Sequence, residues 1–82
     1  MGYHKAQIVK GQIGEISKIQ EELDELKDAM DQDAKIMALV ELSDLYGAIT
    51  LYLEKHHKGT TMEDLRIMSE LTRKAFRDGD RV

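Results

Sequence analysis

The chain has no cysteine, no proline and no tryptophan, and its aromatic residues are three tyrosines and one phenylalanine. Without cysteine it has neither a disulfide nor a thiolate metal site, which fits a reducing compartment. The shortage of aromatic side chains disfavours the stacking of nucleic-acid bases. The rest of the chain is rich in Leu, Ile, Met, Ala, Glu and Lys, which favour helix, so the composition predicts an all-α protein.

The net charge and the distribution of apolar residues indicate where the protein is located and which kinds of partner it does not bind. The 16 acidic and 12 basic residues give a net charge of −4, which argues against a general affinity for nucleic acid or anionic lipid. No uninterrupted apolar run of about 18 residues occurs, so no membrane span is expected. The first residues also lack the apolar segment of a secretory signal. We therefore expect a cytoplasmic protein that binds neither nucleic acid nor membrane.

Apolar residues recur at intervals of three and four, which predicts three helices. Their expected ranges are about 13–30, 34–57 and 62–78. We treat residues 1–82 as a single domain in which residues 1–12 are a poorly defined N-terminal segment. Short connections predict an up-down-up arrangement of the three helices.

Polar residues between the predicted helices supply candidate caps. Asp31 or Asp33 is expected to cap the second helix by accepting a hydrogen bond from a free backbone N–H. Thr60 and Glu63 have the spacing of a capping box for the third helix. Gly59 is suited to the left-handed conformation that ends the second helix.

The second predicted helix is apolar on two of its sides. A helix with this pattern is central in its fold or is covered by another subunit. A chain of 82 residues buries only a modest share of its surface and is marginally stable alone. We therefore expect a homodimer or a homotetramer that forms an oligomeric helical bundle.

Two acidic clusters lie in the first and second predicted helices. Residues three apart share a face of a helix, so Glu22 projects with Glu25, and Glu41 projects with Asp44. If the two helices pack antiparallel, these four carboxylates meet, and they repel one another unless a cation lies between them. Oxygen ligands of this kind favour Mg²⁺, with Mn²⁺ as the alternative. The spacing therefore predicts a metal site.

The remaining residues of the clusters supply candidates for chemistry. Glu21, together with Glu22, is the candidate for orienting or deprotonating a water that attacks phosphorus. Neither cluster contains the Glu-x-x-His pair of di-iron helical sites, so no histidine ligand is expected. The adjacent His56 and His57 point about 100° apart and are expected at a helix end.

Three basic residues near the C-terminus, Lys74, Arg77 and Arg81, follow one another at helical spacing. They face one way if the third helix continues through them, and they would then bind the β and γ phosphates of a nucleotide. The alternative is a solvated helix end whose positive charges suit the helix dipole. Both interpretations remain open from the sequence.

The pattern Glu21-Glu22-Leu23-Asp24-Glu25, followed by Glu41-Leu42-Ser43-Asp44, resembles the MazG-type all-α nucleoside triphosphate pyrophosphohydrolases. The run from Glu41 to Tyr46 is similar to the Glu-Leu-Gly-Asp-Leu-Leu of that family, and the basic segment 73–77 lies where members carry a similar one. The resemblance covers about residues 14–81.

This resemblance implies hydrolysis of a nucleoside triphosphate between the α and β phosphates, giving a monophosphate and pyrophosphate. It implies Mg²⁺ held by Glu22, Glu25, Glu41 and Asp44, with Glu21 nearby. It also implies dimers or tetramers in which a neighbouring subunit completes each site. The alternatives are a helical interaction protein whose acidic residues serve solubility, and a family member that binds nucleotides without catalysis.

Overall fold

The computed structural model describes residues 4–79, which form three α-helices and, within that range, no strand. The helices are α1 (Ile16–Asp31), α2 (Lys35–His56) and α3 (Met62–Arg77). The all-α prediction is therefore confirmed, and each helix lies within a few residues of its predicted range. The residues at either end of the chain, 1–3 and 80–82, lie outside the description, and this includes Arg81.

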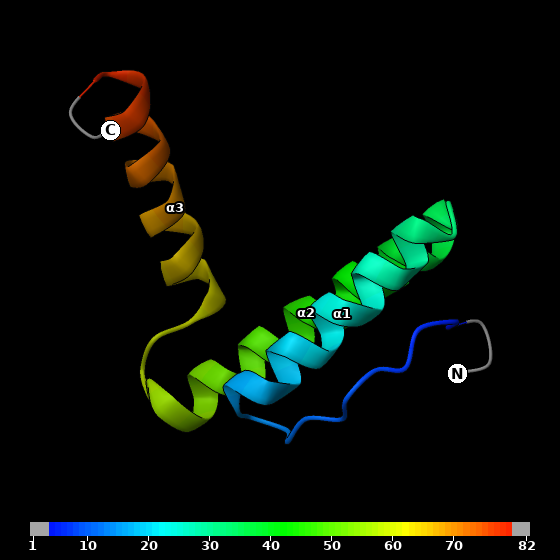
Figure 1. Cartoon of the computed structure of the whole chain (residues 1–82). Helices are drawn as coiled ribbons and strands as arrows, with labels where there is room; N and C mark the ends of the chain where they lie inside the picture. Colours follow the sequence, from blue (N-terminus) through cyan, green and yellow to red (C-terminus); the bar gives the residue numbers. More distant parts are fainter. Residues whose placement is uncertain (1–3, 80–82) are drawn as a thin grey trace.

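Helices α1 and α2 form an antiparallel hairpin, whereas α3 leaves it and projects away (Figure 1). The turn between α1 and α2 depends on Asp33, which has a positive φ of 54°, and on a hydrogen bond from Ala34 N to Ala29 O. Aspartate tolerates this left-handed conformation better than most residues. The predicted aspartate cap of the second helix is wrong, because Ala34 is the N-cap residue and no side chain caps α2.

A capping box does begin α3, one residue later than predicted. The side chain of Thr61 accepts a hydrogen bond from Asp64 N, and the carboxylate of Asp64 accepts one from Thr61 N. The box predicted from Thr60 and Glu63 is therefore wrong in register. The structure does not pack α3 along α1 or α2, so the up-down-up bundle is not seen within one chain.

The interior of the hairpin contains more carboxylates than apolar side chains. Among the described residues, the buried apolar side chains are those of Ala29, Ala48 and Leu53. Most of the large apolar side chains are exposed instead, and they include Val9, Ile13, Ile16, Met30, Ile36, Leu39, Tyr46, Met68, Leu71 and Phe76. The single chain thus leaves most of its apolar surface uncovered.

By length and composition alone, α2 is long and apolar enough to cross a membrane. A helix enclosed by other helices of a soluble protein meets the same criteria. Glu41 and Asp44 lie within this helix, and charged groups at the centre of a bilayer are costly. The cytoplasmic location remains a prediction.

The N-terminal segment, residues 4–15, is not helical and runs antiparallel along α1 (Figure 1). Asp28 accepts hydrogen bonds from Lys5 N and Ala6 N, and Glu21 accepts one from Gly11 N. Gly11 permits a close approach to α1, because a Cβ atom there would lie 2.2 Å from Ser17 O. The segment predicted as poorly defined therefore has a specific path, anchored by two carboxylates of α1.

Candidate metal centre

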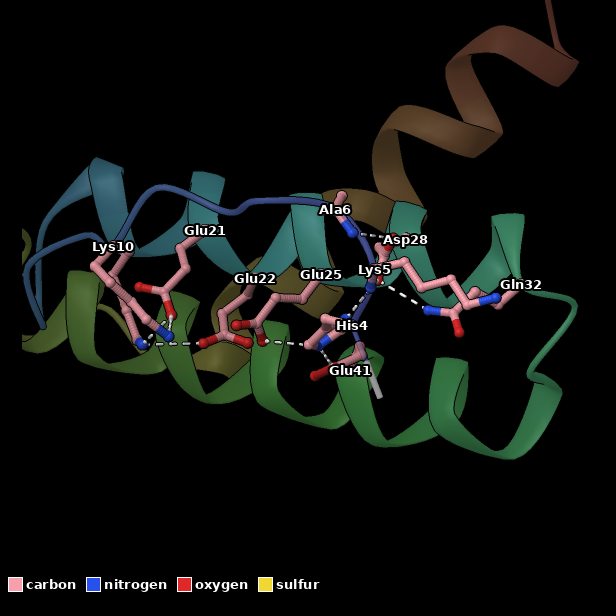
Figure 2. Close-up of polar contacts among 11 residues, drawn as sticks. His4, Lys5, Ala6, Lys10, Glu21, Glu22, Glu25, Asp28, Gln32 and Glu41 are labelled. Atoms are coloured by element: carbon pink, nitrogen blue, oxygen red, sulfur yellow. Dashed lines mark hydrogen bonds and ion pairs between the residues drawn. The ribbon is translucent and has the colours of Figure 1, made fainter. Parts of the chain in front are cut away.

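Four carboxylates converge between the two helices of the hairpin. Glu22 and Glu25 project from α1, Glu41 and Asp44 project from α2, and one oxygen of each lies within 4.8 Å of one oxygen of every other. Figure 2 shows three of these side chains pointing into the space between the helices. Glu22 and Glu41 are buried, Glu25 is half-buried and Asp44 is exposed. The i, i+3 spacing places the residues as the sequence predicts, with one side of the cluster open to solvent.

The cluster carries more negative charge than its surroundings balance. Glu22 Oε2 is buried and has no hydrogen-bond partner among the described residues. Burial, together with the nearby charges of Glu22 and Glu41, raises the pKa of Glu25 to about 7. Burial and the neighbouring Glu41 and Glu22 also raise the pKa of Asp44. A group of this kind takes up either a proton or a cation.

Glu21 lies beside the cluster, and its oxygens face other groups. One oxygen accepts the hydrogen bond from Gly11 N at 2.8 Å, and the other lies 3.0 Å from Lys18 Nζ. Burial raises the pKa of Glu21, but these bonds and the charges of Lys18 and Lys10 outweigh burial, and the net pKa is lowered. Glu21 is therefore a charged anchor for the N-terminal segment. Its role toward a water remains a prediction.

Lys18 is a residue of the site that the sequence reasoning missed. Its Nζ lies 3.1 Å from Glu22 Oε1 as well as 3.0 Å from Glu21 Oε2. Lys10 Nζ lies 3.7 Å from Glu21 Oε2 and is largely exposed. The signal that points to Lys18 is its spacing, three and four residues before Glu21 and Glu22 on the same helix.

A histidine also reaches the carboxylates, contrary to the expectation that none is available. The imidazole of His4 lies with Nδ1 at 2.8 Å from Asp28 Oδ2 and Nε2 at 2.9 Å from Glu41 Oε2 (Figure 2). Its Nε2 is 3.9 Å from Glu25 Oε2. No sequence pattern indicates this contact, because His4 belongs to a non-helical segment. Asp28 could have been predicted to share a helix face with Glu25, since it follows Glu25 by three residues.

Asp28 holds the N-terminal segment and the imidazole together. Burial raises the pKa of Asp28, but hydrogen bonds from His4, Ala6, Lys5 and Gln32 outweigh burial, and the net pKa is lowered. The carboxylate therefore remains charged and acts as an acceptor. Its position fixes the orientation of the His4 ring relative to Glu41.

The basic residues predicted to bind phosphate do not meet the cluster within one chain. Lys74 and Arg77 lie in the last turn of α3, which points away from the hairpin (Figure 1), and Arg81 lies outside the described residues. Arg77 Nε is 3.8 Å from the adjacent Asp78. His56 is exposed at the end of α2, as predicted, and pairs with Glu15 at 2.8 Å.

Comparisons with known proteins add no relative. No family model, no curated protein and no solved structure matches the chain. The functional argument therefore depends on the residues and their geometry.

The raised pKa values predict how the metal-free protein responds to pH. A carboxyl whose folded pKa exceeds its unfolded pKa binds a proton more tightly when folded, so its protonation adds stability below the folded pKa. For Glu25 this stability is fully present below about 4.5 and is lost as the pH rises through about 7. We expect the melting temperature, measured by circular dichroism with a chelator present, to rise by several degrees between pH 8 and pH 5.5.

Glu25→Gln is the matched variant, because it removes the titrating group and keeps the shape. The variant should lose a large part of the dependence on pH in this window. Glu21 and Asp28 do not contribute to the change in this window. Their pKa values are lowered from 4.5 and 3.8, so the stability they add is lost only as the pH falls below those values. A melting temperature that falls from pH 8 to pH 5.5 would contradict the cluster's charge repulsion.

Proposed function

We propose that the protein is a Mg²⁺-dependent nucleotide pyrophosphohydrolase of the MazG-like type. It would cleave a ribo- or deoxyribonucleoside triphosphate between the α and β phosphates, releasing the monophosphate and pyrophosphate. The observation that carries the proposal is the convergence of four carboxylates from α1 and α2. One of them, Glu22, has a buried oxygen, Oε2, without a hydrogen-bond partner among the residues that the structure describes.

The donor set fits Mg²⁺, with Mn²⁺ as a substitute. All four carboxylates offer oxygen, which hard cations prefer, and Asp44 is exposed, so solvent reaches the cluster on that side. When bound, the metal would neutralise phosphate charge and lower the pKa of a coordinated water. The chain's part is to hold the oxygens in place, and Glu22 and Glu21 are the candidates for orienting that water.

Positive charge for the phosphates is available from two sources. Lys18 lies beside Glu22, and Lys10 lies beside Glu21; a lysine can bind phosphate oxygens as a point charge. The second source is the group predicted from the sequence, Lys74, Arg77 and Arg81. In one chain the last turn of α3 is distant from the cluster, so this group requires a neighbouring subunit.

The proposal includes a homodimer or homotetramer. Many apolar side chains of α2 and α3 are exposed, and α3 does not pack along either helix of its own hairpin. In an oligomer, α3 of one chain would cover the hairpin of another and complete the helical bundle. This arrangement would also bring the basic end of α3 toward a neighbouring carboxylate cluster.

Two measurements test the proposal. At a Mg²⁺ concentration ten times its dissociation constant, a site present only in the folded state adds about 1.4 kcal/mol, which raises the melting temperature of so small a domain by about 5–10 °C. Incubation with a panel of ribo- and deoxyribonucleoside triphosphates should then release pyrophosphate and the monophosphate. No response to Mg²⁺ or Mn²⁺ would refute the metal site.

The product identifies the type of protein. Pyrophosphate release requires cleavage between the α and β phosphates, whereas inorganic phosphate would indicate a different hydrolase. Binding of nucleotide and Mg²⁺ without any product would favour the non-catalytic alternative. The panel also identifies the preferred base and sugar.

A further inference from the structure

The imidazole of His4 lies among the carboxylates and offers a nitrogen, rather than an oxygen, as a metal ligand. Its side chain is 8% exposed, and its Nε2 is close to Glu41 Oε2 at 2.9 Å and to Glu25 Oε2 at 3.9 Å. Ligand atoms from His4, Glu25 and Glu41 lie within 4.8 Å of one another. Three ligand atoms at this separation can bind one divalent ion.

The environment of the ring determines which nitrogen faces the carboxylates. Asp28 already accepts hydrogen bonds from Lys5 N, Ala6 N and Gln32 Nε2, and as a charged carboxylate it can only accept. Nδ1 therefore carries the hydrogen that points at Asp28 Oδ2, 2.8 Å away. In a neutral imidazole Nε2 then presents a lone pair to Glu41.

A lone pair of Nε2 and a carboxylate oxygen at 2.9 Å repel each other unless a cation lies with them. Either a proton on Nε2 or a metal ion removes this repulsion. The arrangement of Asp28, His4 and the carboxylates is that of metal-binding histidines, whose second nitrogen donates to a carboxylate that orients the ring. Glu25 and Glu41 also belong to the four-carboxylate cluster, so an ion bound by His4 Nε2 would lie at the edge of that cluster.

We infer that His4 Nε2, Glu25 and Glu41 bind a borderline divalent metal such as Mn²⁺, Co²⁺ or Zn²⁺, with Asp28 as the positioning residue of the ring. This inference rests on the proposed metal site, with which it shares Glu25 and Glu41. It goes beyond that site because an imidazole ligand changes the preference among metals. Nitrogen ligands suit Zn²⁺ and other transition metals, whereas Mg²⁺ prefers oxygen.

The test compares metals and variants by isothermal titration calorimetry of the full chain. His4→Gln is expected to lower the affinity for Co²⁺ and Zn²⁺ about 100-fold. It should change the affinity for Mg²⁺ less than about threefold, since Mg²⁺ gains little from a nitrogen ligand. Asp28→Asn should lower the affinity for Co²⁺ and Zn²⁺ about tenfold or more, which is the usual effect of losing a group that orients a metal ligand. His57→Gln is the matched control, because it removes an exposed histidine at the end of α2, and it should bind all three metals as the wild type does.

A measurement on the wild-type protein avoids dependence on the folding of a variant. In the Co²⁺-loaded protein, the Nδ1–H of a coordinated imidazole should appear as a strongly shifted, exchangeable proton resonance. No such resonance, or equal Co²⁺ affinity in folded His4→Gln, would overturn the inference. Tighter binding of all metals by that variant would also overturn it, because His4 would then compete with metal.

The outcomes separate this inference from the proposed function. If the wild type binds Mg²⁺ and His4→Gln binds Mg²⁺, Co²⁺ and Zn²⁺ equally well, the histidine ligand is refuted. The proposed carboxylate site is then unaffected. No binding of any metal by the wild type refutes both the ligand and the pyrophosphohydrolase. Circular dichroism of each variant confirms that the helices are retained.

Discussion

Glu41→Gln is expected to abolish the Mg²⁺-dependent rise in melting temperature and to reduce pyrophosphate release about a thousandfold. Glu41 is 1% exposed, one of its oxygens lies 2.9 Å from His4 Nε2, and it belongs to the cluster with Glu22, Glu25 and Asp44. Glutamine keeps the shape but removes the charge that attracts the metal. Metal ions contribute several kcal/mol of charge stabilisation to phosphoryl transfer, which corresponds to a rate change of this size.

The matched control is Glu54→Gln, which removes an exposed carboxylate from the same helix. It should retain both the response to Mg²⁺ and the activity. Thermal melts with and without Mg²⁺, followed by a pyrophosphate assay at saturating nucleotide, provide the comparison. Full activity in Glu41→Gln would remove the metal from the mechanism, and with it the assignment as a pyrophosphohydrolase.

Leu71→Glu is expected to dissociate the protein into monomers and to lower its helix content. Leu71 is 64% exposed in the single chain, and Leu39 on α2 is 66% exposed. Burying one such side chain is worth about 1.5–3 kcal/mol, so a carboxylate introduced into a dimer interface would be strongly unfavourable. Light scattering after gel filtration should give the wild type at least twice the 9.4 kDa of one chain.

Arg66→Gln serves as the control for this prediction. It changes the net charge by the same single unit and lies on the polar face of α3, where Arg66 pairs with Glu63. The control should keep the mass of the wild type. A wild-type mass near that of one chain would contradict self-association, and it would leave Lys74 and Arg77 without a carboxylate cluster to act on.

The helices were predictable because their apolar residues follow helical spacing. Their boundaries were less certain, as the start of α3 illustrates. Two threonines stand beside each other before two acidic residues, so the sequence permits a capping box in either of two registers. The structure uses Thr61 with Asp64. A break between the first two helices was predicted at residues 31–33, but the left-handed conformation of Asp33 was not, because an aspartate before a helix is usually a cap.

The candidate site was predictable where it depends on local spacing. Glu22 with Glu25, and Glu41 with Asp44, share helix faces whatever the tertiary fold, and an antiparallel hairpin then brings them together. The contact of His4 with Glu41 spans 37 positions of the chain, and nothing periodic marks the segment that carries it. The direction of α3 is equally hidden, since its amphipathic pattern shows that one face needs cover but does not show which surface provides it.

The small apolar interior has a consequence for tolerance to substitution. Ala29, Ala48 and Leu53 leave few places where trimming a side chain would open a cavity. In most proteins such losses at the centre are the most damaging. In this protein we expect a scan of all substitutions to show the opposite pattern. The largest losses of stability should occur at the buried carboxylates and at the leucines that are exposed in the single chain.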